Sequence, residues 1–133
     1  MKLARIVFLV AAIWGVLVIT PLFFIFNSIG KQDPPPITHP GFYYGFATTA
    51  LAWQVAFFVI ASNPLRLRPL MVPSFLEKVS YATLVVVLFL QGRMRAPDLV
   101  LGIVDLLFAV LFLAVFLRTA NQAEVKTRTT ASC

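Results

Sequence analysis

Charged residues, histidine and cysteine are scarce in this sequence of 133 residues. Only 12% of the residues are charged, and the chain has one histidine, His39, and one cysteine, Cys133. A single cysteine cannot form an intrachain disulfide, and a lone loop histidine with no second His or Cys nearby does not make a zinc site. The sequence also lacks a nucleotide-binding or nucleophile motif. We therefore expect no catalytic residue, no metal and no cofactor, which favours a non-enzymatic protein.

Apolar residues dominate instead: 60% of the chain is hydrophobic and the mean hydropathy is +0.92. Soluble domains average about 45–50% apolar and about 25% charged residues, so a water-soluble fold is excluded. Four apolar runs cover residues 6–29, 42–61, 74–91 and 99–117. About 20 helical residues cross a hydrocarbon core roughly 30 Å thick. The sequence predicts an all-α protein with a single four-helix transmembrane domain over residues 1–120.

Short links between the runs predict an up-down four-helix bundle, because short links make consecutive helices antiparallel neighbours. Residues 121–133 are expected to form a flexible cytoplasmic tail. Cytoplasmic flanks of membrane helices are enriched in Lys and Arg, which favours cytoplasmic N- and C-termini in a cell inner (plasma) membrane. With this orientation eight basic residues lie inside and three outside; the inner set is Lys2, Arg5, Arg66, Arg68, Lys78, Arg118, Lys126 and Arg128, and the outer set is Lys31, Arg93 and Arg95. Topology and attraction to anionic lipid then explain the net charge of +6, and no nucleic-acid partner is needed.

Asp105 is the candidate functional residue, because it lies in the apolar body of the last run. Carboxylates inside membrane helices face the bundle interior or a wet cavity, and by default they mark a functional site. Judged by depth, Thr20, Thr48 and Thr49 lie near the same level, and Arg93 and Arg95 could reach inward from the outer loop. These residues predict a ligand or proton site around Asp105. The alternative is a buried hydrogen-bonding residue that fixes helix register.

The cytoplasmic loop is the second candidate, since Arg66 and Arg68 alternate with leucines between three prolines. With Lys78, which we expect to extend to the membrane boundary, they could hold an anionic lipid headgroup or the acidic segment of a partner. The simpler interpretation is a basic anchor at the cytoplasmic face. Glu77 is expected to form a structural ion pair with Arg66 or Arg68 rather than to act in catalysis.

Small residues and one proline predict how the helices pack. Gly41, Gly45 and Thr49 recur every four residues, and such spacing lets another helix approach closely. Ala52 and Ala56 extend small-residue spacing on a nearby stripe, and Ala11 and Gly15 offer a similar contact in the first run. Pro21 lacks an amide hydrogen and should kink the first helix. Trp53 and Gln54 lie deeper and need hydrogen-bond partners. A homodimer through the small-residue stripe, or another membrane-protein partner, is a reasonable expectation.

The four helices, the short links and the turn Asn63-Pro64-Leu65-Arg66-Leu67-Arg68-Pro69-Leu70 loosely resemble the DoxX-like group of small bacterial membrane proteins. That resemblance implies the architecture and transfers no catalytic residue. Members of the group are implicated in quinone-linked or thiol-linked redox processes, but a single cysteine leaves no dithiol here.

Two functions remain. The sequence favours a scaffold, accessory or regulatory subunit; the alternative is a small proton- or ion-coupled transporter, or a lipid- or quinone-handling protein, with a polar pocket around Asp105.

Overall fold

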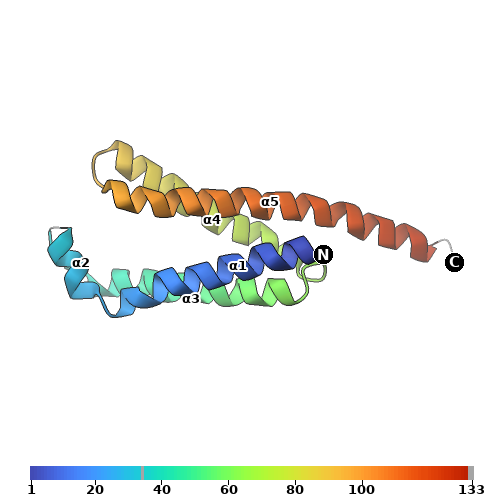
Figure 1. The fold of residues 1–133 in the computed structure, drawn as a ribbon, viewed down its shortest axis with the longest axis horizontal. Coiled ribbons are helices and arrows are strands. Elements are labelled where there is room, and N and C mark those ends of the chain that lie inside the picture. Colours follow the sequence, from blue (N-terminus) through green and yellow to red (C-terminus); the bar gives the residue numbers. More distant parts are fainter. Residues whose placement is uncertain (34, 132–133) are drawn as a thin grey trace.

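The computed structural model describes the backbone of residues 1–33 and 35–131 and the side chains of residues 1–33 and 35–120. This part of the chain is helical and contains no β-strand (Figure 1). Its elements are α1 (Lys2–Ile19), the 3-10 turn η1 (Thr20–Phe23), α2 (Phe26–Gln32), α3 (Pro40–Ser62), the 3-10 turn η2 (Arg68–Leu70), α4 (Met71–Leu90) and α5 (Ala96–Ala131).

In the described part of the chain, four helical segments are long and apolar enough to cross a membrane. They are Lys2–Phe23, Pro40–Ser62, Arg68–Leu90 and Ala96–Ala120, with mean hydropathies from 1.5 to 2.9. The number of membrane-spanning helices therefore agrees with the number of apolar runs in the sequence. A multi-pass membrane protein follows from these lengths and compositions.

The first apolar run is not one helix, contrary to the expectation for residues 6–29. The α-helix ends at Ile19, Pro21 lies within η1, and the chain starts again as the short helix α2. The Pro21 ring has no amide hydrogen and collides with the carbonyl group one turn earlier. The consequence is a helix end, which is more than the predicted kink. The Tyr43 hydroxyl donates a hydrogen bond to the Leu22 carbonyl at 2.7 Å and so satisfies one backbone group in this break.

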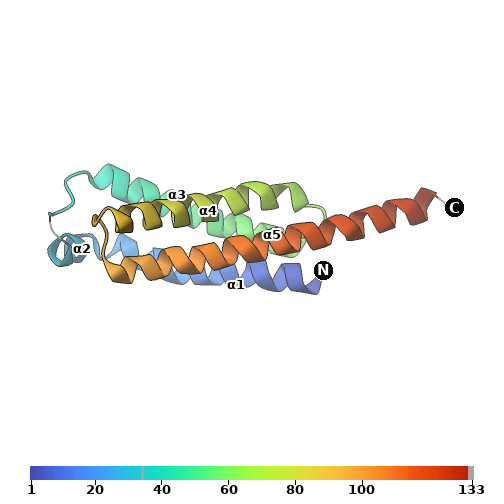
Figure 2. The same ribbon diagram turned by 90° about the horizontal axis from the view of Figure 1, so that it is seen from above.

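The helices form two pairs, α1 with α3 and α4 with α5, which lie side by side in both views (Figures 1 and 2). Contacts between α5 and α1 join the pairs, whereas α3 and α4 touch at few residues although one short loop connects them. The N-terminus lies at the same end of the bundle as this loop, and α2 lies at the opposite end with the α4–α5 turn. We call these the N-terminal end and the α2 end.

Three phenylalanines from three helices form the centre of the core. The rings of Phe8 in α1 and Phe112 in α5 stack with centroids 4.2 Å apart, and Phe57 in α3 meets Phe112 edge to face at 5.2 Å. All three side chains are fully buried. Aromatic pairs in these geometries contribute about 0.5–1.5 kcal/mol beyond the area they bury. This cluster therefore holds the two helix pairs together.

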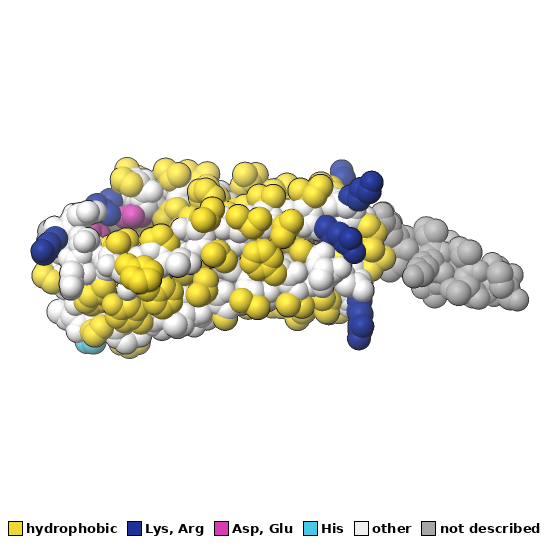
Figure 3. Space-filling view, turned by 60° about the horizontal axis from the view of Figure 1, so that its bottom comes forward, with side chains coloured by type: hydrophobic (Ala, Val, Ile, Leu, Met, Phe, Trp, Pro, Cys, Tyr) yellow, Lys and Arg dark blue, Asp and Glu magenta, His cyan; other side chains and the backbone are white. Residues whose placement is uncertain are grey.

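The outer surface is apolar along the length of the bundle, and the Lys and Arg side chains on the face drawn in Figure 3 gather at its two ends. Large apolar side chains point outward from every long helix, among them Leu17, Val55, Leu84 and Val110. In water such a surface would be strongly unfavourable, but lipid tails solvate it well. The α5 helix continues to Ala131. The predicted tail, 121–133 with Cys133, lies outside the residues whose side chains are described.

Two glycines allow close helix contacts, and neither belongs to the stripe expected on α3. A Cβ atom on Gly102 in α5 would lie 2.7 Å from Val85 Cγ1 in α4, and one on Gly15 in α1 would overlap the Gln54 side chain of α3. Gly41 and Gly45 have no atom near enough to meet a Cβ. The expected stripe faces outward, because α3 presents Ala47, Ala50, Gln54 and Phe57 to the core instead.

Candidate functional site: a buried charge cluster between two helices

The most unusual feature of the bundle is an ion pair between helices in its apolar interior. The Lys78 ammonium in α4 lies 3.1 Å from Asp105 Oδ1 in α5 and donates a hydrogen bond to Oδ2 at 3.3 Å. Lys78 is 5% exposed, and the Asp105 side chain is 13% exposed. At about 1.5 Å per residue, Lys78 lies roughly 10 Å inside α4 and Asp105 roughly 13 Å inside α5. Both side chains are therefore well inside the spanning segments.

A second carboxylate approaches the same ammonium. Glu77 Oε2 lies 3.4 Å from Lys78 Nζ, and the Glu77 side chain is 19% exposed. The oxygen is buried, yet it has no hydrogen-bond partner among the described residues. Glu77, Lys78 and Asp105 together form what we call the charge cluster. Its ionised form has two negative charges and one positive charge, so the cluster carries one excess negative charge.

Aromatic and aliphatic groups surround this cluster. The Lys78 ammonium lies 5.5 Å from the centroid of the Phe57 ring in α3, within the range of a cation–π interaction. The three side chains are largely buried, so the attraction between opposite charges is stronger than in water. Burial of charges is costly unless they are paired. The pairing of Lys78 with Asp105 therefore follows from its position inside the bundle.

Glu77 also borders an open groove between α3 and α4. The groove has a volume of about 490 Å³, and its lining is Trp53 from α3 with Pro73, Leu76, Glu77, Val79 and Ser80 from α4. The Ser80 hydroxyl donates to the Leu76 and Glu77 carbonyl groups of its own helix. Glu77 is thus the ionisable group of the groove, and it connects the charge cluster with the side of the bundle.

The threonines expected around Asp105 lie elsewhere. Thr20, Thr48 and Thr49 are exposed on the outer surface, and the Thr48 hydroxyl donates to the Tyr44 carbonyl one turn earlier in its own helix at 2.7 Å. Asp105 instead faces α4, where its carboxylate meets the Lys78 ammonium. The polar site is therefore built on α4 and α5, without a contribution from these threonines.

Lys78 and Glu77 also differ from their expected roles. The α4 helix begins at Met71, three residues before the predicted start, so the two residues lie about two turns inside it. Lys78 is buried and pairs with Asp105, and Glu77 pairs with Lys78 rather than with Arg66 or Arg68. Neighbouring helix positions diverge by about 100°, but these two long side chains bend toward the same interior and meet.

The two loop arginines are not equivalent. Arg68 Nε donates to the Phe116 carbonyl at 3.3 Å, and its guanidinium lies 3.9 Å above the Phe116 ring. Arg68 therefore fastens the loop to α5. Arg66 is exposed and remains available to a headgroup. At the α2 end, Arg95 lies 3.7 Å from Asp33 and 3.4 Å from Asp98, so it does not extend to Asp105.

Gln54 is a buried polar residue whose partners the sequence could not identify. Its side chain is 0% exposed, and Nε2 donates to the Ala50 carbonyl at 2.8 Å. Its Oε1 atom has no hydrogen-bond partner within the described part of the chain. The close approach of Gly15 leaves room for this side chain between α1 and α3.

Two sequence signals could have pointed to the Lys78–Asp105 pair. Opposite charges inside two consecutive apolar runs are rare, and such residues usually pair with each other. The midpoint of the two positions also falls at the turn that follows α4, so in a helical hairpin they would lie opposite one another. Within the described residues, no three His, Cys, Asp or Glu side chains gather to form a metal centre.

No protein-family profile, curated protein or solved structure matches this chain. The resemblance to the DoxX-like group therefore depends on the helix number, the short links and the loop sequence alone.

Proposed function

We propose that the chain forms an up-down bundle that crosses the inner (plasma) membrane four times, with both termini on the cytoplasmic side. Two arrangements support this topology. The N-terminus and the α3–α4 loop lie at the same end of the bundle, and that end carries Lys2, Arg5, Arg66, Arg68 and Arg118. Cytoplasmic ends of membrane helices are basic in this way. The described residues at the α2 end include basic residues too, but Asp33 and Asp98 partly neutralise them.

We further propose that the charge cluster binds and releases one proton or one monovalent cation, as the working site of a small ion-coupled transporter. The observation that carries this proposal is the approach of two carboxylates, Glu77 and Asp105, to one buried ammonium, with distances of 3.4 and 3.1 Å. An ion pair needs only one carboxylate. The second leaves a net negative charge in an apolar surrounding, where an uncompensated charge is costly.

Glu77 is the better candidate for the exchanging group. Asp105 accepts a hydrogen bond from Lys78, whereas Glu77 Oε2 has no hydrogen-bond partner in the described part of the chain and its side chain borders the groove. A proton or cation that joins Glu77 neutralises the cluster without disturbing the Lys78–Asp105 pair. Its release restores the charge. The cluster thus has two states that differ by one unit of charge.

The experiment is an ion-flux measurement on the full chain in proteoliposomes. An imposed Na⁺ or K⁺ gradient drives proton movement, which a trapped pH-sensitive dye reports. We expect Glu77→Gln to abolish the flux, because it removes the excess charge and retains the Lys78–Asp105 pair. Asp98→Asn is the matched control, since it removes a carboxylate from the start of α5 outside the cluster. Wild-type flux in Glu77→Gln, or no flux above empty liposomes in the wild type, would overturn the proposal.

A second candidate function is that of an accessory subunit or scaffold, including a homodimer, which the sequence favours. The observation behind it is the outward stripe of Gly41, Gly45 and Thr49 on α3, which no described residue covers. Stripes of small residues in membranes allow a partner helix to pack closely. Gly45→Leu should then abolish crosslinking between copies or to a partner in native membranes and leave proton flux intact. Unchanged crosslinking in this variant would count against the scaffold.

A further inference from the structure

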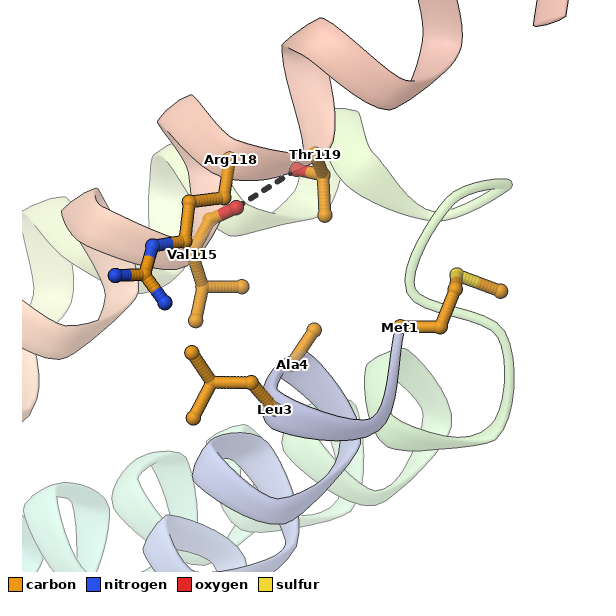
Figure 4. Close-up of a pocket in the computed structure, with 6 residues that line it drawn as sticks. All are labelled: Met1, Leu3, Ala4, Val115, Arg118 and Thr119. Carbon is orange, nitrogen blue, oxygen red and sulfur yellow. Dashed lines mark hydrogen bonds between the residues drawn. The ribbon is translucent and has the colours of Figure 1, made fainter.

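A cleft at the N-terminal end of the bundle is separate from the charge cluster and has its own chemistry. It lies between the start of α1 and the final turns of the spanning part of α5, and it has a volume of about 130 Å³ (Figure 4). Its lining is Met1, Leu3, Ala4, Val115, Arg118 and Thr119. The Thr119 hydroxyl donates to the Val115 and Phe116 carbonyl groups, so its hydrogen is already used within α5. The walls are therefore mainly apolar.

Apolar cavities of about 150 Å³ stay dry and accept small apolar groups. This cleft is of similar size, but it differs in having a cation at its margin. The Arg118 side chain is exposed and extends beside Val115 and Leu3 in Figure 4. Among the described residues it has no carboxylate within ion-pair distance. A ligand that suits the cleft therefore combines an apolar part with an anionic group.

The basic residues around the cleft strongly favour an anionic ligand. The described residues at this end include Lys2, Arg5, Arg66, Arg68 and Arg118, whereas the described acidic residues lie in the charge cluster or at the α2 end. Arg5 donates to the Ser62 carbonyl and Arg68 to the Phe116 carbonyl, and neutral acceptors leave both charges uncompensated. An anion at the cleft is attracted by all of them.

The level of the cleft identifies the source of the anion. The first membrane-spanning segment begins at Lys2, and the last apolar run ends at residue 117, directly before Arg118. Residues 1–4 and 115–119 therefore lie where the hydrocarbon region gives way to headgroups. A phospholipid has its phosphate diester at that level and its acyl chains directly below. An arginine fork suits phosphate oxygens particularly well.

We infer that this cleft is a binding site for an anionic phospholipid, with the phosphate on Arg118 and the upper part of an acyl chain between α1 and α5. The site differs from the one expected at Arg66, Arg68 and Lys78. Lys78 is buried in the charge cluster and Arg68 is fastened to Phe116, so two of those three residues are already engaged. The inference does not depend on the ion-coupled function, because the cleft shares no residue with the charge cluster.

The test is native mass spectrometry of the full chain after exchange into mixed micelles of phosphatidylglycerol and phosphatidylcholine. We expect the wild type to retain one phosphatidylglycerol in preference to phosphatidylcholine by at least about fivefold. Arg118→Gln should remove this preference. Arg66→Gln is the matched control, because it deletes the same charge at the same end but outside the cleft. Leu3→Trp, which fills the cleft and keeps every charge, should also reduce retention of phosphatidylglycerol. This variant provides the test if Arg118→Gln does not fold.

Three outcomes would overturn the inference. Equal losses in Arg66→Gln and Arg118→Gln would mean that the whole basic end attracts lipid without a specific site. Equal retention of the two lipids by the wild type would mean that the anionic group is not recognised. Displacement of phosphatidylglycerol by millimolar inorganic phosphate would mean that the site takes a free anion rather than a lipid.

Discussion

Lys78 and Asp105 lie 27 positions apart in the sequence, and their side chains meet across the α4–α5 pair with 3.1 Å between ammonium and carboxylate. The pair joins the two helices at a level where water is scarce. Removal of one partner leaves the other charge without compensation, which costs more than the pair contributes. The stability of this half of the bundle should therefore respond sharply to the charge balance of the cluster.

Lys78→Met should lower the free energy of unfolding by about 3–5 kcal/mol, the cost typical of leaving a buried charge unpaired. Here the substitution leaves two buried carboxylates, those of Glu77 and Asp105, without their cation. The double variant Lys78→Met with Asp105→Asn should recover part of this loss, since one of them is then neutral. Unfolding by increasing SDS, followed by circular dichroism, measures these differences. Arg66→Met serves as control, and equal effects of Lys78→Met and Arg66→Met would contradict the structural role of the pair.

Gly102→Ala should destabilise the protein by about 1–3 kcal/mol, the usual cost of overpacking. The added Cβ would lie 2.7 Å from Val85 Cγ1 and 2.9 Å from Val85 Cβ, so α5 has to move away from α4. Val85→Ala in the same chain should restore part of the stability. Gly45→Ala adds the same group where no atom lies within 4 Å and should have little effect. Thermal unfolding in detergent compares the variants, and similar losses for both glycines would be inconsistent with this packing.

Tyr43→Phe should reduce stability by about 0.5–1.5 kcal/mol, the net value of a typical hydrogen bond. The hydroxyl it removes donates to the Leu22 carbonyl in the break between α1 and α2. Tyr44→Phe is the control, because Tyr44 stacks on Phe26 at 5.5 Å through its ring, which phenylalanine retains. Hydrogen exchange at residues 20–26 should rise in Tyr43→Phe alone. Equal exchange in the two variants would argue against the Tyr43–Leu22 bond.

Gln54→Met should raise the free energy of unfolding by about 1 kcal/mol. A buried acceptor without a partner costs about 1–3 kcal/mol, and Gln54 Oε1 is such an acceptor. Methionine has a similar length and fits beside Gly15 without a polar atom that needs a partner. Gln32→Met changes an exposed residue at the end of α2 and controls for the substitution itself. A loss of stability in Gln54→Met would show that the amide makes a contribution to the fold that outweighs its unpaired oxygen.

The sequence predicted the helical class and the four spanning segments because both depend on composition and run length. Segment lengths near 20 apolar residues leave few alternatives in a bilayer. Helix boundaries were less predictable where an apolar run continues through a proline. The run 6–29 is apolar throughout, so hydropathy could not locate the end of α1 at Ile19, which the backbone chemistry of Pro21 determines.

The candidate site was predictable in part. Asp105 stands out because a carboxylate in an apolar run needs a partner, but depth alone pointed to threonines that lie on the outer surface. Helix rotation decides which residues face inward, and a helix that is apolar on all sides gives no periodic signal for it. The same limit applies to the glycines. The expected contact at Gly15 is present, whereas Gly41 and Gly45 have the spacing of a contact stripe but meet no atom, and the contact at Gly102 was not predicted.

The position of α2 restricts how an ion or molecule could arrive at the charge cluster. Asp33, at the C-terminus of α2, lies 3.7 Å from Arg95 beside the start of α5, so the short helix is held across one end of the bundle (Figure 1). The core phenylalanines fill the centre between the pairs. An open groove lies on the flank between α3 and α4, where Trp53 and Glu77 form part of its lining. A proton or cation that exchanges at Glu77 should therefore arrive through this lateral groove rather than along the axis of the bundle.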